Sequence, residues 1–158
     1  MPANRALQDL LDQYKEGKLD LDAAAEAIEG LRLERVGDFA CLDLGRNVRC
    51  GLPEVVLAEG KDAGHLAEIA LSHAVAAGRC VITRISHEQA DAVRKLAADA
   101  GIEVEHRIAG RVLIVGNGPA PVPTGGIVAI ITAGTSDIRV AEEAKVIAEE
   151  MGCEVRTA

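Results

Sequence analysis

Aromatic side chains are almost absent from this 158-residue chain, which contains Tyr14, Phe39 and no Trp. Proteins that hold single-stranded nucleic acids stack the bases on aromatic rings, so the composition disfavours that class. Acidic residues also outnumber basic ones, and the formal net charge at pH 7 is −8. A protein that binds duplexes needs a basic face to displace counterions from phosphates. We therefore predict that no nucleic acid is a partner.

Recognisable metal-binding, disulfide and membrane-spanning patterns are missing as well. The cysteines are Cys41, Cys50, Cys80 and Cys153, and no pair has the CxxC spacing of a zinc site. The four histidines form no ligand cluster and are interpreted as surface or structural residues. No apolar run is long enough to cross a bilayer, and no signal peptide precedes the cysteines. The sequence thus predicts a cytoplasmic protein with reduced thiols, no metal site and no membrane partner.

What the chain does contain is an aliphatic α/β pattern, because about half of its residues are hydrophobic and most of these are Ala, Val, Leu and Ile. Two amphipathic stripes, Leu7–Tyr14 and Leu21–Leu31, predict a helical hairpin over residues 1–36, with Asp20 capping the second helix. A packing or oligomerisation role for this hairpin is favoured over a functional arm.

A small α/β sandwich domain is predicted for residues 37–115. Strands are expected at 39–44, 55–57, 80–83, 104–108 and 112–115, with helices at 62–77 and from Ser86 to about Ala100. The segment 116–126, GNGPAPVPTGG, is rich in proline and glycine and is predicted to be a linker rather than a phosphate loop.

Residues 127–158 predict the first β-α-β unit of a Rossmann-like parallel-sheet domain. The run Ile127–Ile131 is typical of a strand that is buried on both faces. The helix that follows is expected to turn Val140, Ala144, Ile147 and Met151 inward. A two-stranded parallel sheet cannot cover both its faces, so either neighbouring subunits complete it or the chain is a fragment of a longer protein. The fragment is the favoured interpretation.

A candidate ligand site lies in the turn that enters this helix, at Gly134, Thr135, Ser136 and Asp137. Free N–H groups and the positive end of a helix favour a phosphate or carboxylate, and Asp137 is suited to accept hydrogen bonds from ribose hydroxyls. Arg139 is unfavourable beside the helix dipole but sensible beside an anion. The alternative is that Ser136 or Asp137 simply caps the helix.

A second candidate site combines Asp43, Arg46 and Arg49 with Lys61. The two arginines are three residues apart, so one helical turn would point both guanidinium groups in the same direction, toward a phosphate or carboxylate. The alternative is that they form ion pairs with Asp43 and Glu54, and spacing alone favours that interpretation.

Together these segments resemble the pyridinium-3,5-biscarboxylic acid mononucleotide synthase family. The likeness rests on three motifs and runs from about residue 35 to the end of the chain. The motifs are Asp43-x-x-Arg46-x-x-Arg49-x-Gly51-x-Pro53-Glu54-Val55, Glu59-Gly60-Lys61, and Thr132-Ala133-Gly134-Thr135-Ser136-Asp137-x-x-Val140-Ala141-Glu142-Glu143-Ala144. The last is shared more loosely with carboxyaminoimidazole ribonucleotide mutase, in which a Ser-Asp turn holds the ribose phosphate of the substrate.

The resemblance implies carboxylation of nicotinic acid adenine dinucleotide by CO2 or bicarbonate, with hydrolysis of its phosphoanhydride to release AMP. The product is the first intermediate of the nickel-pincer nucleotide cofactor of lactate racemase. The resemblance also implies a nucleophilic cysteine beyond Ala158, a homo-oligomer (an octamer for full-length members) and no covalently bound cofactor, with Mg2+ as a candidate. Two departures stand out: histidine is common in the family where this chain has Leu44 and Gly45, and proline is expected at Arg139.

Two alternatives belong to other classes. One is a non-catalytic nucleotide-binding or regulatory protein that uses the 134–137 turn as a sensor. The other is a purine-type mutase, which fits that turn but leaves the arginine-rich block and the long first domain without a role.

Overall fold

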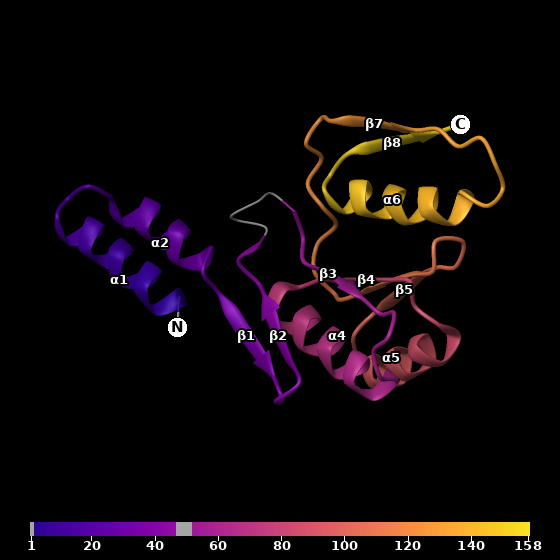
Figure 1. Ribbon diagram of the computed structural model, residues 1–158, viewed down its shortest axis with the longest axis horizontal. Helices are drawn as coiled ribbons and strands as arrows, with labels where there is room; N and C mark the ends of the chain where they lie inside the picture. Colours follow the sequence, from indigo (N-terminus) through magenta and orange to yellow (C-terminus); the bar gives the residue numbers. More distant parts are fainter. Residues whose placement is uncertain (1, 47–51) are drawn as a thin grey trace. The chain divides into compact units, whose positions relative to one another are not determined.

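The computed structural model describes residues 2–46 and 52–158 and has the predicted mixed α/β fold (Figure 1). The chain divides into two compact units, Met1–Glu54 and Val55–Ala158. The first unit holds a pair of helices and a two-stranded sheet, and the second holds a four-stranded sheet and a β-α-β unit.

The first unit begins with the two predicted helices, α1 (Pro2–Lys15) and α2 (Leu21–Glu29), which contact each other. Gly17 has φ +71 in the short link, a conformation that glycine adopts without strain. Asp20 caps α2 as predicted, since its Oδ1 accepts a 2.8 Å hydrogen bond from the backbone N–H of Ala23. The helical hairpin is confirmed.

Two antiparallel strands follow, β1 (Leu33–Val36) and β2 (Ala40–Asp43). Strand β1 was not predicted, because two of its four residues are charged and its alternation of apolar and polar side chains is weak. The predicted boundary between residues 36 and 37 therefore lies in the turn of this β-hairpin, and the compact unit continues to Glu54.

The second unit is centred on a sheet with strand order β3-β4-β6-β5. Its strands are β3 (Val55–Leu57), β4 (Cys80–Thr83), β5 (Val104–Arg107) and β6 (Val112–Val115), and only the β3–β4 pair is parallel. Helices α4 (Ala63–Ala77) and α5 (His87–Asp99) pack against each other. All six elements lie within about one residue of their predicted positions. Strands β4 and β6 are buried along their whole length.

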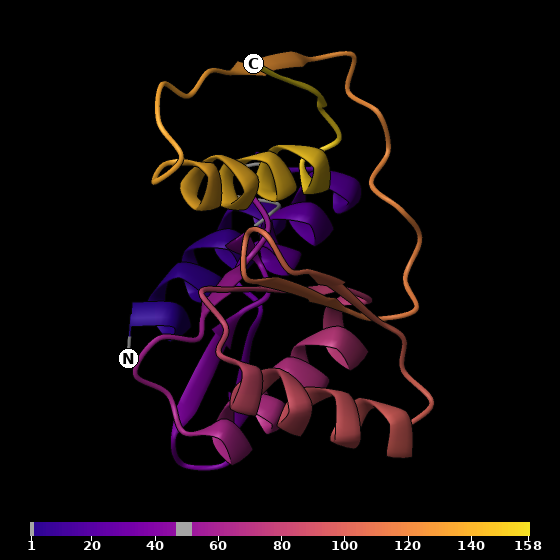
Figure 2. The ribbon, with the colours of Figure 1, turned by 90° about the vertical axis from the view of Figure 1, so that its right-hand side faces the viewer.

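A third helix, α6 (Ile138–Glu150), covers the sheet face opposite to α4 and α5 (Figures 1 and 2). Val146 of α6 is 2% exposed and belongs to the same buried cluster as Val112 and Ile114. The predicted inward face was wrong in part, because Val140 is 65% exposed and Ala144 is exposed as well. The buried face of α6 packs against the four-stranded sheet. The prediction considered only the β-α-β unit, which does not include that sheet.

An ion pair fixes the end of α6 beside the start of β4. Arg79 donates through Nε and Nη2 to the two carboxylate oxygens of Glu150, at 2.9 and 2.6 Å. This hydrogen bond to Glu150 is the main reason that the pKa of Arg79 is raised above its usual value. A bidentate pair of this kind holds the two elements in a defined orientation.

The predicted linker, residues 116–126, contains no helix or strand but is tied to its surroundings. The Asn117 side chain donates to the carbonyl of Gly101 and accepts from the N–H of Glu103. The Thr124 hydroxyl donates to the carbonyl of Gly152 and accepts from the N–H of Gly126. Gly152 has φ +77, and a Cβ there would lie 2.2 Å from the carbonyl oxygen of Val122, so only glycine fits. The segment is a packed connection between the four-stranded sheet and the β-α-β unit.

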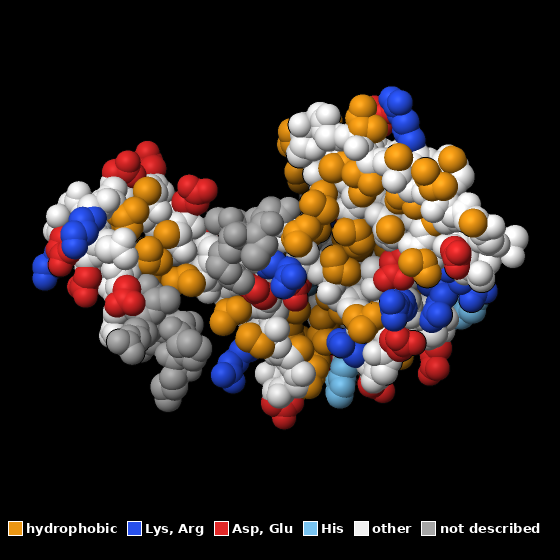
Figure 3. Space-filling view, turned by 45° about the horizontal axis from the view of Figure 1, so that its top comes forward, with side chains coloured by type: hydrophobic (Ala, Val, Ile, Leu, Met, Phe, Trp, Pro, Cys, Tyr) orange, Lys and Arg blue, Asp and Glu red, His pale blue; other side chains and the backbone are white. Residues whose placement is uncertain are grey.

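The β-α-β unit is present as predicted, with β7 (Ile127–Ile130) parallel to β8 (Glu154–Thr157). Burial of β7 on both faces was predicted and is not found, since Ile127 is 59% exposed and the following Ile131 is 80% exposed. The reason is that β8 is the only strand paired with β7 among the described residues. Hydrophobic side chains are spread over the upper part of the larger body in Figure 3, where this unit lies.

Candidate functional site

The predicted turn 134–137 leads from the carboxyl end of β7 into α6. Its shape is held by a 3.1 Å hydrogen bond from the N–H of Asp137 to the carbonyl of Gly134. The Ser136 hydroxyl lies 3.2 Å from Oδ1 of Asp137 and donates to it. All four residues of the turn are exposed, so a ligand can reach them.

The start of α6 carries no side-chain cap. Asp137 occupies the N-cap position with φ −89 and ψ −11, and its side chain makes no capping hydrogen bond. An N-cap residue usually has extended backbone, which aims its side chain at the N–H groups of the first turn. The sequence left open the alternative that Asp137 simply caps the helix. The structure does not show that capping hydrogen bond. The first N–H groups of α6 stay available to an external acceptor.

The second predicted set is divided between the two units. Asp43 is half-buried at the end of β2, and Arg46 is exposed with its Nε 3.9 Å from Oε2 of Glu54. That contact agrees with the ion-pair alternative for Arg46. Arg49 lies outside the described residues. Lys61 belongs to the second unit, so its grouping with Asp43, Arg46 and Arg49 stays a prediction.

Lys61 lines a cavity of about 390 Å3 at the carboxyl ends of β3 and β4. Two arginines, Arg84 and Arg111, and three acidic residues line it too. Arg84 is engaged with acidic partners, because it lies 3.4 Å from Glu59 and 3.6 Å from Glu143. The carboxyl edge of parallel strands is where α/β proteins commonly bind ligands.

The loop beneath Lys61 is fixed by a buried glutamine. Gln89 donates through Nε2 to the carbonyl oxygens of Ala58 and Lys61, both at 2.8 Å. Its Oε1 accepts from the N–H of Ser86, while the Ser86 hydroxyl accepts from the N–H of Gln89. This capping box therefore closes the start of α5 and also positions the loop that carries Lys61.

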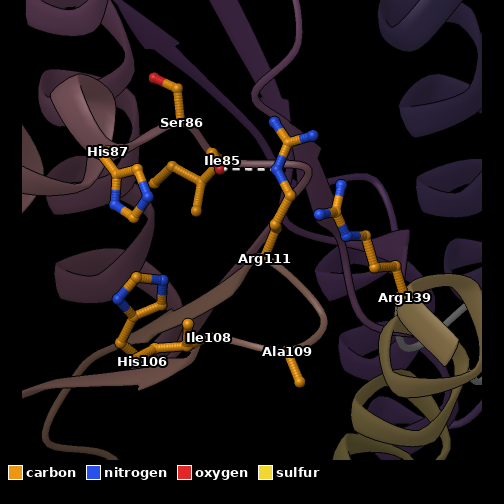
Figure 4. Close-up of a pocket in the computed structure, with 8 residues that line it drawn as sticks. All are labelled: Ile85, Ser86, His87, His106, Ile108, Ala109, Arg111 and Arg139. Atoms are coloured by element: carbon orange, nitrogen blue, oxygen red, sulfur yellow. Dashed lines mark hydrogen bonds between the residues drawn. The ribbon is translucent and has the colours of Figure 1, made fainter.

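An adjoining cavity of about 560 Å3 shares Ser86 and Arg111 with the first (Figure 4). Sequence reasoning did not predict it, because its residues come from three separate segments. The start of α5, the β5–β6 hairpin and the first turn of α6 line it, through Ile85, Ser86, His87, His106, Ile108, Ala109, Arg111 and Arg139. The only signal in the sequence was the unfavourable position of Arg139 in the first turn of a helix.

Cysteines and metal ligands are not gathered at the turn. Cys80 is buried at the start of β4, and Cys153 precedes β8, at the sheet edge opposite to the turn. Cys50 lies outside the described residues. Within residues 2–46 and 52–158, no three His, Cys, Asp or Glu side chains are close enough to hold a metal ion together. No helix in that same part of the chain has the length and apolar character needed to cross a membrane.

Comparison with known proteins gives two findings. The family model described as LarB/PurE-like N-terminal domain matches residues 33–116, from the first residue of β1 to the residue after β6. The chain is also 36% identical to uncharacterized protein MJ0165 of Methanocaldococcus jannaschii over 154 residues. That alignment covers 96% of this chain and 60% of the relative, so the chain spans less than two thirds of the relative's length.

Proposed function

The chain belongs to the family defined by the LarB/PurE-like N-terminal domain, and on that premise we propose that it is part of a pyridinium-3,5-biscarboxylic acid mononucleotide synthase. Such an enzyme carboxylates the pyridine ring of nicotinic acid adenine dinucleotide with CO2 or bicarbonate and releases AMP, on the way to the nickel-pincer nucleotide. The uncapped start of α6, at the carboxyl end of a parallel strand, carries the proposal.

In this proposal the turn binds a phosphate and ribose of the dinucleotide. The backbone N–H groups at the start of α6 donate to phosphate oxygens, and the Ser136 hydroxyl leaves its 3.2 Å contact with Asp137 to join them. The Asp137 carboxylate then accepts hydrogen bonds from ribose hydroxyls, which keeps its negative charge away from the phosphate. Gly134 and Thr135 shape the turn and leave room for the ligand.

The second predicted set would contribute positive charge. Lys61 lies in a cavity with Arg84 and Arg111, which suits the carboxylate or phosphoanhydride of the substrate. Asp43, Arg46 and Arg49 are proposed to serve the active site or a contact between subunits. Magnesium dependence is a separate part of the same proposal, to be tested by adding a chelator to the assay.

The chemistry has two balanced steps. Carboxylation forms a carbon–carbon bond to the pyridine ring, and the ring hydrogen at that carbon leaves as a proton. Hydrolysis adds water across the phosphoanhydride and yields AMP and a mononucleotide. A cysteine thiolate that adds to the ring would make it an electron-rich carbon nucleophile. We propose that this thiolate belongs to a residue of the full-length enzyme beyond Ala158, as the family resemblance implies, since none of the four cysteines of this chain falls in a motif that matches it.

Self-association is proposed as well, with an octamer as the form expected for a full-length member. The β-α-β unit supports this, because Ile127, Ile131 and Val140 expose most of their apolar surface. Large exposed apolar side chains of this kind are candidates for burial between subunits. Light scattering on the complete gene product measures the number of subunits.

The activity can be tested directly with the complete gene product. Incubation with nicotinic acid adenine dinucleotide and 13C-bicarbonate should release AMP and give a mononucleotide that carries one 13C carboxylate. Chromatography measures the first product and mass spectrometry the second. The matched control is nicotinamide adenine dinucleotide, which lacks the ring carboxylate.

Tight binding of the dinucleotide without either product would reject the synthase and support the non-catalytic nucleotide-binding protein. Turnover of carboxyaminoimidazole ribonucleotide in its place would support a purine-type mutase. Neither binding nor turnover would reject both nucleotide-based proposals.

A further inference from the structure

The cavity drawn in Figure 4 differs from the rest of this acidic protein in its charge. The chain has a formal net charge of −8, yet none of the eight residues that line the cavity is acidic. Two are arginines, two are histidines, and Ile85, Ile108 and Ala109 supply apolar walls. Two guanidinium groups in one cavity repel a cation and attract an anion.

The guanidinium of Arg111 is held in place by the backbone around it. Its Nε donates to the carbonyl of Ile85 at 3.1 Å, and its Nη2 donates to the carbonyl of Arg84 at 2.8 Å. Nη1 has no hydrogen-bond partner within the described residues. Both Arg84 and Arg111 have positive φ, 55 and 52, a conformation that non-glycine residues rarely adopt. Strained backbone of this kind persists where surrounding contacts enforce it, often at binding sites.

Arg139 approaches the same cavity from the first turn of α6. Its side chain makes no hydrogen bond or ion pair with any residue that the structure describes, and it lies at the positive end of a helix. Figure 4 shows its guanidinium on the same side of the cavity as that of Arg111. An anion placed there would interact favourably with both guanidinium groups and with the helix dipole at once.

The two histidines stand on the other side of the cavity, with their rings near each other (Figure 4). The pKa of His106 is lowered mainly by burial, then by the positive charges of Arg94 and His87, and Asp91 opposes these effects. Arg94 also donates to Nδ1 of His106. Burial therefore favours the uncharged form of the His106 ring, and an anion that enters the cavity would favour its protonation.

We propose that this cavity binds the phosphate or carboxylate group of a small ligand, with Arg111 as the fixed anchor and Arg139 as the second donor. The apolar wall formed by Ile85 and Ile108 would contact the uncharged part of the ligand. The inference does not require the synthase activity, because it rests only on the geometry and charge of the cavity.

The test follows the 158-residue chain by 1H–15N NMR while inorganic phosphate, AMP or nicotinate is added in a phosphate-free buffer. The key variant is Arg139→Gln, because this side chain makes no contact that the fold depends on. Arg156→Gln is the matched control, since Arg156 is an exposed arginine of the same unit, paired only with Glu154. The pKa of His106 is read from its ring protons in each sample.

The inference predicts saturable shifts for the amides of residues 85–87, 106–111 and 139. It also predicts an increase in the pKa of His106 when the anion binds. Arg139→Gln should weaken binding by about tenfold or more, because a charge-assisted contact is lost, and Arg156→Gln should change it less than twofold. Strong binding of phosphate would assign the cavity to a free anion. Preference for AMP or for nicotinate would assign it to the corresponding part of a larger ligand.

Shifts that do not saturate, or equal weakening by Arg139→Gln and Arg156→Gln, would overturn the inference, because non-specific charge explains both. The double variant Ser136→Ala/Asp137→Ala separates this site from the nucleotide turn. If phosphate still binds to that variant with a rise in the His106 pKa, the cavity acts independently of the turn. If the double variant abolishes both effects, the anion belongs to the turn and the inference fails.

Discussion

The three long helices of the second unit begin in two different ways. Helix α4 is capped by Asp62, whose Oδ1 accepts from Gly64 and His65 at 2.9 and 3.1 Å. Helix α5 is capped by the reciprocal Ser86–Gln89 pair. Helix α6 has an acidic residue at its N-cap position and no capping hydrogen bond.

This difference separates two kinds of acidic and hydroxyl residue. Those at the starts of α4 and α5 stabilise their helices, whereas those at the start of α6 are candidates for binding a ligand. A side-chain cap typically stabilises a helix by about 1 kcal/mol, so an unused cap beside suitable side chains requires another explanation. A ligand that supplies the acceptor gives one. Removing the side chains at α4 and α5 should therefore change stability, and removing them at α6 should change binding.

The largest effect is expected at the turn before α6. In a full-length protein, Ser136→Ala together with Asp137→Ala should abolish binding of nicotinic acid adenine dinucleotide, with affinity reduced by roughly 100-fold or more as several hydrogen bonds are lost. Stability should change by less than about 0.5 kcal/mol, because no cap is removed. Calorimetry measures the affinity and chemical denaturation the stability; unchanged affinity would refute the assignment of these residues.

Next in size is Gln89→Ala, which should lower the free energy of unfolding by roughly 2–3 kcal/mol. The reason is that Gln89 is buried and serves two carbonyl groups and the N–H of Ser86, which the variant leaves without that partner. Gln13→Ala, at an exposed position of α1, is the control and should change stability only slightly. Equal effects in urea denaturation would mean that Gln89 does not hold the loop.

A smaller difference in stability is expected between variants of two serines. Ser86→Ala removes the cap of α5 and should cost about 1 kcal/mol, whereas Ser136→Ala removes no backbone contact and should cost almost nothing. Thermal unfolding of the two single variants makes the comparison. A loss of similar size for Ser136→Ala would show that this serine caps α6 in solution.

The smallest effect concerns pH. Hydrogen bonds from the N–H groups of His65 and Gly64 lower the pKa of Asp62 below its usual value of 3.8. A carboxyl with a depressed folded-state pKa stabilises the fold above its unfolded pKa, and this contribution is lost as pH falls through the folded value. Asp62→Asn should therefore flatten the decline in stability below about pH 4, and an unchanged pH profile would contradict the cap.

Most of the fold was predictable because its elements are local. Caps and stops such as Asp20, Asp62, Ser86 and Gly78 mark the helices, and apolar runs such as Cys80–Thr83 mark the buried strands. Strand β1 escaped prediction because its side chains are half charged. The inward face of α6 was misjudged because its partner, the four-stranded sheet, lies earlier in the sequence and the helix crosses back over it.

The candidate site was predictable only in part, for the same reason. The turn 134–137 is contiguous in sequence, so its position before a helix could be predicted. The cavity of Figure 4 could not be predicted, because its lining residues His87, His106, Arg111 and Arg139 come together only through tertiary packing. Arg139 was the one residue whose local position already suggested an anion.

The contrast between capped and uncapped helices can be measured most directly by NMR. Nicotinic acid adenine dinucleotide is added to the 15N-labelled chain, and the amide shifts at the starts of the three helices are compared. We expect saturable shifts at Ile138, Arg139 and Val140 and almost none at Gly64, His65 and Gln89. Equal shifts at all three helices, or shifts confined to α4 and α5, would contradict this expectation.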